Sequence, residues 1–231
     1  MTTIQTIPAH EVVQRTYPRP PREQDGVVIA VGRAIDGTLS HFSHEFRQGR
    51  RPTATAMRMY GETLLAEELE EAALAPSSVE RTALLEEVNG SVLAFRKTPA
   101  FGLPRPKSRV ILIDNQVGVY AQPDYWDGTG RFYEMKSYRA IPPPPDVTLQ
   151  LRLFQLAFPR FESVLLCIAR HAKPIETTSV VVPPPTPEET LAVLRQAFQL
   201  GREHGQPKVL EYVDGPLVYY DLPKDLGSAA P

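Results

Sequence analysis

The alternation of apolar and polar positions divides the chain into helical and extended segments. Strong helix formers with apolar residues at helical spacing predict a long helix from about Thr55 to Leu74. The continuous apolar run from Ser163 to Arg170 predicts a strand that is buried on both faces. Glu188 to Glu203 predicts another helix, and Val27 to Val31 is typical of a short strand.

Two stretches rich in Tyr, Phe and Val flank a turn in the middle of the chain. The turn is Asp127-Gly128-Thr129-Gly130, and the stretches are Val117 to Tyr125 and Arg131 to Tyr138. Asp-Gly between such stretches favours a hairpin. Arg109 to Asp114 adds a strand before them, so we expect three consecutive strands.

Proline-rich segments separate the later elements. Pro142 to Pro145 is incompatible with regular structure, and Asp146 can then cap a helix that reaches about Phe158. Val182 to Pro187 forms a second linker. Lys208 to Asp221 predicts a last hairpin that turns at Asp214-Gly215.

Length and element order predict one α/β domain with elaborations at both ends. A chain of 231 residues with 42% hydrophobic composition buries one substantial core. The order of elements predicts a mixed central β-sheet flanked by helices. We expect an extended arm over residues 1–25, where prolines recur, a main domain over 26–206, and a hairpin and tail over 207–231.

Charge and cysteine content narrow the function classes. A net charge of -2 argues against coating nucleic acid non-specifically, so a nucleic-acid partner must be held by a local basic surface. The single cysteine, Cys167, excludes a disulfide framework and a four-cysteine metal or iron–sulfur site within the chain. Because no stretch approaches the ~20 apolar residues of a membrane span, and the N-terminus lacks the apolar core of a signal peptide, we expect a cytoplasmic protein with no membrane partner.

Candidate chemistry centres on the middle hairpin. Strand alternation puts Glu134 and Lys136 on one face, and a tight turn brings Asp124 nearly opposite Glu134. Two neighbouring carboxylates repel unless a hard cation such as Mg²⁺ or Mn²⁺ lies between them. A metal would activate water and hold a phosphate, while Lys136 could orient the water or stabilise developing charge. Solvated side chains on an ordinary hairpin are the alternative interpretation.

Three motifs carry a family resemblance. Gln122-Pro123-Asp124, Tyr133-Glu134-Met135-Lys136-Ser137 and Leu149 to Phe154 resemble the successive motifs of RecB-like nucleases in the PD-(D/E)xK superfamily. The resemblance covers the middle third to half of the chain and implies a restriction-endonuclease-like core. It also implies that Asp124, Glu134 and the backbone carbonyl of Met135 bind metal, and that Lys136 is the catalytic lysine.

Two departures from the family pattern bear on this interpretation. The family places Tyr four residues after Gln, whereas Gln150 is followed by Phe154 here; Gln150 is either a polar partner in the site or a solvated helix residue. The family's Gly-x-x-x-His motif matches Gly61 to Leu65, where histidine is missing. Glu62, on the same helix face, is the candidate substitute ligand, or else a solvated acid.

The expected function is that of a metal-dependent nuclease, a hydrolase of phosphodiester bonds with DNA as the expected substrate, in repair, recombination or defence. The alternatives are an inactive nuclease-fold protein that binds nucleic acid or acts as a scaffold, and an unrelated α/β protein with an accidental motif. We also expect the protein to form a homo-oligomer or to be part of a larger repair or defence complex. Arg58, Arg131 and Arg139 are the leading candidates for contacts with nucleic acid, within a wider set of basic residues that includes Arg47, Arg50, Arg51, Lys107 and Arg109.

Overall fold

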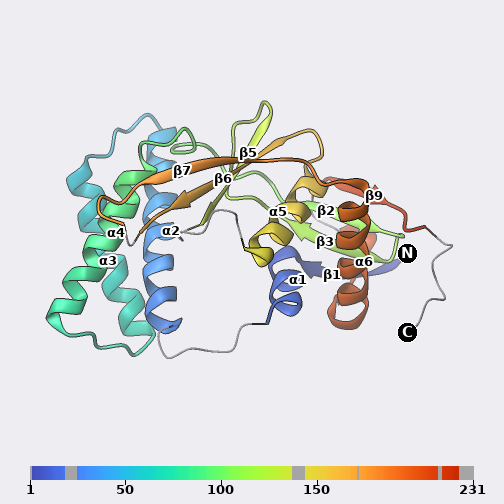
Figure 1. The fold of residues 1–231 in the computed structure, drawn as a ribbon, viewed down its shortest axis with the longest axis horizontal. Coiled ribbons are helices and arrows are strands. Elements are labelled where there is room, and N and C mark those ends of the chain that lie inside the picture. Colours follow the sequence, from blue (N-terminus) through green and yellow to red (C-terminus); the bar gives the residue numbers. More distant parts are fainter. Residues whose placement is uncertain (1, 19–24, 137–143, 171, 213–214, 224–231) are drawn as a thin grey trace.

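The computed structural model describes residues 2–18, 25–136, 144–170, 172–212 and 215–223, and it shows an α/β protein with helices around two mixed sheets (Figure 1). The helices are α1 (Ala9–Thr16), α2 (Asp25–Arg47), α3 (Ala54–Glu71), α4 (Ser78–Phe95), α5 (Pro145–Ala157) and α6 (Pro187–His204), with a short 3-10 turn at Leu210–Tyr212. The strands are β1 (Thr3–Pro8), β2 (Arg109–Ile113), β3 (Val117–Ala121), β4 (Tyr125–Trp126), β5 (Arg131–Lys136), β6 (Glu162–Ile168), β7 (Thr177–Val182), β8 (Gln206–Val209) and β9 (Leu217–Tyr220).

The first sheet joins segments from both ends of the chain. Its strand order is β8-β1-β3-β2-β9. Strand β1 runs parallel to β3 and antiparallel to β8, and β2 runs antiparallel to β3 and parallel to β9. Helices α1, α5 and α6 pack on this sheet around a core that includes Ile7, Ile111, Val119 and Leu153.

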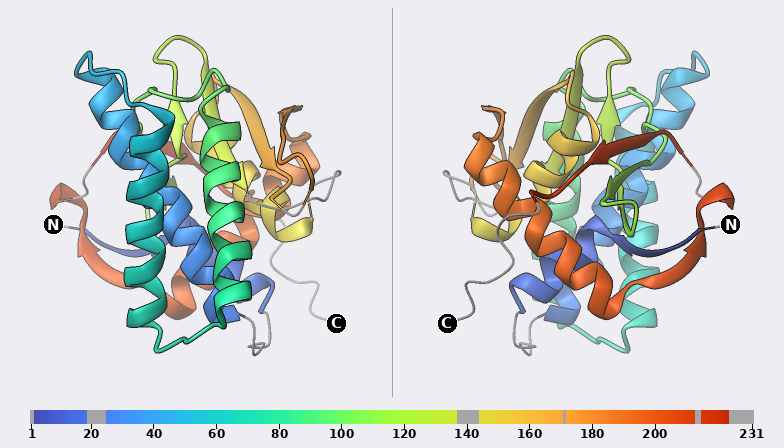
Figure 2. Two further views of the ribbon diagram at one scale, coloured as in Figure 1. Left: turned by 90° about the vertical axis from the view of Figure 1, so that its left-hand side faces the viewer. Right: turned by 90° about the vertical axis from the view of Figure 1, so that its right-hand side faces the viewer.

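The second sheet links that half of the molecule to a group of three helices. Its order is β4-β5-β6-β7, with β5 and β6 parallel and the other two pairs antiparallel. Figure 2 shows α2, α3 and α4 side by side, and their core includes Tyr133 of β5 and Leu166 of β6. Phe132 of β5 packs in the other core, so β5 lies between the two.

Local sequence explains several helix boundaries. Ser77 and Thr186 each cap a helix through a capping box, with Glu80 and Glu189 returning the hydrogen bond three residues later. Helix α5 begins with Pro145 at its first position, where the missing N–H costs nothing. Asp146 lies in the first turn of α5 rather than at its cap, so the predicted helix is present but starts earlier than its proposed cap.

The N-terminal segment differs from the extended arm predicted for residues 1–25. Residues 3–8 form the buried interior strand β1, and α1 follows directly. Prolines suggested an arm, but Pro8 is compatible with this arrangement because it precedes the first helical residue, where its backbone N–H is not needed. Ile4 and Ile7 are fully buried, so this segment belongs to the core.

Three other predictions of local structure were wrong. Val27 to Val31 belongs to helix α2, since an apolar run of this length suits a buried helix equally well. Val117 to Tyr125 is not one strand, because Pro123 lacks the N–H for a ladder and β3 ends at Ala121. Strands β8 and β9 form no hairpin within the 207–231 segment: they pair with β1 and β2 respectively. The predicted turn residue Asp214 lies outside the described residues.

Candidate active site

The central hairpin is held by its turn. Tyr125 pairs with Tyr133, and Trp126 pairs with Phe132. In the turn, Oδ1 of Asp127 accepts hydrogen bonds from the backbone N–H groups of residues 129, 130 and 131. Desolvation alone would raise the pKa of Asp127, but these hydrogen bonds outweigh it and lower the pKa to about 2. The turn therefore fixes the register of β4 against β5.

Asp124 lies where this register predicts, opposite Glu134. Its Oδ2 accepts a hydrogen bond of 2.9 Å from the backbone N–H of Met135. This N–H lies on the β4 side of β5, beyond the residues that pair with β4. Its Oδ1 accepts a hydrogen bond of 3.2 Å from the guanidinium group of Arg105. The carboxylate is thus held between strand β5 and the segment that precedes β2.

Glu134 is the most deeply buried acidic group of the site. Its Oε1 accepts a hydrogen bond of 2.7 Å from Nζ of Lys136, and the residue is only 2% exposed. Among the described residues, its buried Oε2 has no hydrogen-bond partner. Burial, and then the nearby charge of Asp124, raise the pKa of Glu134 well above its usual range.

Lys136 and Asp36 complete the group of charges. Burial lowers the pKa of Lys136, but the charges of Glu134 and Asp124 outweigh that effect, so the net shift is upward and Lys136 stays cationic. Asp36 of α2 is exposed on one side, yet burial against the surrounding protein and the charge of Asp124 raise its pKa. Three acidic and two basic side chains therefore interact here.

These groups line a cavity of about 350 Å³. Helix α2 contributes Gly32, Ile35 and Asp36, and Gln150 enters from α5. The other residues that line the cavity are Arg105, Gln122, Asp124, Glu134, Met135 and Lys136. The structure thus brings together four predicted catalytic side chains, Asp124, Glu134, Lys136 and Gln150.

Other predicted site residues lie elsewhere. Glu62 of α3 accepts a hydrogen bond from Asn89 of α4 and does not line the cavity. Leu65, at the expected histidine position, is buried in the helical core. Arg58 is exposed on α3, and Arg131 is paired with Glu162 at the start of β5. Arg139 lies outside the described residues, as does Ser137 of the second motif.

Sequence reasoning missed Asp36 and Arg105. Gly32 precedes Asp36 by four residues, the spacing that the family resemblance gives to glycine and histidine, so this signal was present in the sequence. It was hidden because Val27 to Val31 was interpreted as a strand. Arg105 lies in an irregular segment among prolines, and no local pattern distinguishes it from a solvated arginine.

The acidic groups of this cavity do not by themselves make up a cluster of metal ligands. In the described part of the chain, no three His, Cys, Asp or Glu side chains are grouped closely enough to hold an ion. Asp124 and Glu134 nevertheless present the oxygen chemistry that Mg²⁺ takes with one or two carboxylates. Oε2 of Glu134 is buried and receives no hydrogen bond from the described residues, and a cation bound to the ionised carboxylate would satisfy it.

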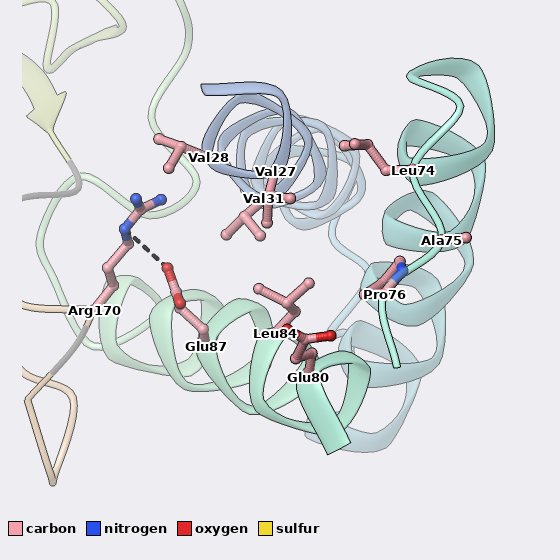
Figure 3. Close-up of a pocket in the computed structure, with 10 residues that line it drawn as sticks. All are labelled: Val27, Val28, Val31, Leu74, Ala75, Pro76, Glu80, Leu84, Glu87 and Arg170. Carbon is pink, nitrogen blue, oxygen red and sulfur yellow. Dashed lines mark ion pairs between the residues drawn. The ribbon is translucent and has the colours of Figure 1, made fainter. Parts of the chain in front are cut away.

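A larger cavity, of about 440 Å³, lies among the helices, apart from these charges. Figure 3 shows Val27, Val31 and Leu84 around it, with Glu87 and Arg170 joined at one side. The Arg170 Nε to Glu87 Oε1 distance is 2.8 Å, and both side chains are largely buried. This mostly apolar cavity lacks the clustered carboxylates of the site above.

Comparisons with known proteins add little to this description. No family model matches the chain, and no curated protein matches it. The crystal structure of SSO0001 is similar over 86% of this chain and 85% of that chain, with 12% sequence identity and a TM-score of 0.34. A likeness of this size supports no conclusion about function. No helix in the described ranges is long and apolar enough to cross a membrane.

Proposed function

We propose that this protein is a metal-dependent nuclease of the PD-(D/E)xK type that hydrolyses phosphodiester bonds in nucleic acid, with DNA as the expected substrate. The observation that carries the proposal is the meeting of Asp124, Glu134 and Lys136 in one cavity, with a buried Glu134 oxygen that lacks a partner. The family resemblance gives these three residues their roles. A cytoplasmic role in repair, recombination or defence, within a homo-oligomer or larger complex, belongs to the same proposal.

Asp124 and Glu134 would hold Mg²⁺ or Mn²⁺ together with a backbone oxygen. A residue in an extended strand directs its N–H and C=O groups to the same side, and the N–H of Met135 points to Asp124. The carbonyl of Met135 therefore faces the same edge as the carboxylate. When bound, the ion supplies activated water and neutralises charge on the phosphate.

Lys136 and Gln150 act on water and phosphate. The ammonium group of Lys136 cannot ligate a cation because it has only donors. It orients the attacking water and stabilises the charge that develops as the bond breaks. Gln150 is half-buried and lines the same cavity, where its amide can hydrogen-bond to the substrate backbone.

A cleavage assay with labelled single- and double-stranded DNA and RNA tests the proposal. We expect cleavage with Mg²⁺ or Mn²⁺, none in EDTA, and at least a hundredfold loss in Asp124→Asn, Glu134→Gln and Lys136→Ala. Glu62→Gln is the matched control because it changes an acidic residue that lies outside the cavity. Cleavage that persists in chelator, or that survives Lys136→Ala at the wild-type rate, would refute the proposal.

One observation favours a second candidate, an inactive nuclease-fold protein that binds nucleic acid or serves as a scaffold. Asp124 and Glu134 each already accept a hydrogen bond from a basic side chain, Arg105 and Lys136 respectively. These contacts compete with a metal for the same carboxylates. Binding of nucleic acid without cleavage under any metal condition would favour this candidate.

A further inference from the structure

Helix α2 carries a line of polar side chains that leads away from the candidate active site. Asp36, Ser40, Ser43 and Arg47 are spaced by four, three and four residues, so they share one face of the helix. We call the three residues that follow Asp36 on this face the α2 track: Ser40, Ser43 and Arg47. The stripe of buried apolar residues that includes Ala34, Leu39 and Phe42 lies beside it, so packing fixes the direction of this face.

The α2 track lines a second, smaller cavity of about 150 Å³, which adjoins the active-site cavity. Asp36, Arg105 and Asp124 line both cavities and therefore stand at their junction. Tyr125 and Leu103 complete the smaller one. The residues that line these two neighbouring cavities lead from Gln150 and Lys136, past Asp36, Arg105 and Asp124, to Arg47.

The donors along this path suit a phosphate backbone. Arg47 donates one hydrogen bond of 2.9 Å to the carbonyl of Leu103, and a guanidinium group has further N–H donors. Arg105 is likewise 54% exposed beside its contact with Asp124. Ser43 is only 1% exposed, and its hydroxyl oxygen accepts a hydrogen bond from the N–H of Gly102, so it connects α2 to the segment that carries Arg105 and leaves Ser40 and Arg47 to face the strand.

The length of the path exceeds that of a single phosphate group. Eleven residues separate Asp36 from Arg47, which corresponds to about 16 Å along a helix axis. A strand of duplex DNA rises by about 3.4 Å per nucleotide. The path is thus long enough for several nucleotides.

We infer that Ser40 and Arg47 of the α2 track, with Arg105, bind the phosphodiester backbone of the substrate strand on one side of the phosphate that is cut. The inference rests on the proposed function, because it assigns the cavity that contains Lys136 and Gln150 to the phosphate under attack. Ser40 and Arg47 are exposed and contact backbone oxygens and no base edges, so they position the strand without reading its sequence, while the buried Ser43 holds the segment of Arg105 in place. The polarity of the strand along α2 then determines which side of the cut is held.

Binding measured without cleavage tests the inference. The full-length Glu134→Gln variant is mixed with a fluorescent single-stranded oligonucleotide in Mg²⁺, and anisotropy gives Kd over a range of salt concentrations. We expect an added Arg47→Gln change to raise Kd about tenfold at low salt and to reduce the salt slope by about 0.7, the value for one lost contact to a single strand. Arg195→Gln, at an exposed arginine of α6, is the matched control and should change neither quantity.

A neutral backbone linkage identifies the phosphate involved. Methylphosphonate, which carries no charge, replaces one phosphate linkage of the oligonucleotide at a time. At one position, the replacement should weaken binding to the protein that retains Arg47 but should not weaken binding to the Arg47→Gln protein any further, as a double-mutant cycle requires. Equal binding by the Arg47→Gln and Arg195→Gln proteins would overturn the inference. Binding that depends on Arg47 in a protein that never cleaves would support the inference and refute the nuclease proposal.

Discussion

The Glu134 carboxyl group is difficult to ionise in the metal-free protein because it is buried beside Asp124. Its pKa is raised from 4.5 to about 8, so the unfolded chain loses this proton at lower pH than the folded chain. The group therefore destabilises the folded state progressively as the pH rises through that window.

Glu134→Gln should therefore stabilise the metal-free protein at the upper end of the window. The amide keeps the shape of the side chain but carries no charge to bury. In EDTA, we expect the variant to melt at a higher temperature than wild type near pH 8, and the difference to shrink towards pH 4.5. Thermal unfolding at both pH values measures this, and a difference independent of pH would contradict it.

The buried ion pair beside the helical cavity contributes to stability in a different way (Figure 3). Glu87→Gln removes the counter-charge of Arg170, a residue only 8% exposed, and should cost about 3–5 kcal/mol. Glu86→Gln is the control, because Glu86 pairs at 3.8 Å with an exposed Lys173 and should contribute under ~1 kcal/mol. Urea unfolding compares the two variants; similar losses would mean that the buried pair is not special.

At the scale of elements, the segment between α4 and β2 is pinned to α2 by one glycine. Gly102 has a φ of +85°, which side chains other than glycine rarely adopt, and a Cβ there would overlap the Phe46 ring of α2. This close approach positions the segment that carries Arg105. Gly102 is therefore a positioning residue for the charges of the site.

Gly102→Ala should cost more stability than Gly49→Ala. Gly49 has a similar φ of +80° but open space around its Cβ position, so its replacement should cost only the backbone strain of about 1–2 kcal/mol. Gly102→Ala adds a clash that typically costs a further 1–3 kcal/mol. It should also shift Arg105 and weaken oligonucleotide binding, which Gly49→Ala should leave unchanged. Equal effects of the two variants would show that the approach to Phe46 is unimportant.

Helix-forming composition allowed α3 and α6 to be predicted from the sequence, and a continuous apolar run allowed β6 to be predicted. The central hairpin followed from Asp-Gly and from strand alternation, which is why Asp124, Glu134 and Lys136 could be paired in advance. Helix α2 could not be assigned, because Val27 to Val31 is apolar and β-branched in a way that suits a strand or a buried helix. Asp36, Ser40 and Ser43 were therefore missed, and Arg47 was named only within a wider set of basic residues.

At the scale of the whole molecule, long-range pairing defines what sequence patterns cannot reveal. The division into two sheets depends on β1 joining β3 and β8, and no local signal in residues 3–8 specifies those partners. The strand was mistaken for an arm because prolines recur among polar residues over the first 25 residues. Because β1 is an interior strand, substitutions of its buried residues should lower the free energy of unfolding.

Ile7→Ala should cost about 2–5 kcal/mol, the usual range for emptying a fully buried site. Thr3→Ala, on the same strand but exposed, should change stability by under ~0.5 kcal/mol. Urea unfolding of both variants measures the difference. An extended, solvated N-terminal arm would make the two substitutions equally harmless.

The position of β1 also governs the order in which the chain can fold during its synthesis. Thr6 donates a hydrogen bond to Gln206, 200 residues later, whereas α2, α3 and α4 contact their neighbours in sequence. At ~5–20 residues per second, this separation corresponds to roughly 10–40 s of translation. The three helices can associate early, whereas β1, which carries Ile4 and Ile7, cannot pair until β3 and then β8 have been synthesised. A nascent chain stalled before residue 206 would expose an unpaired strand edge that invites aggregation.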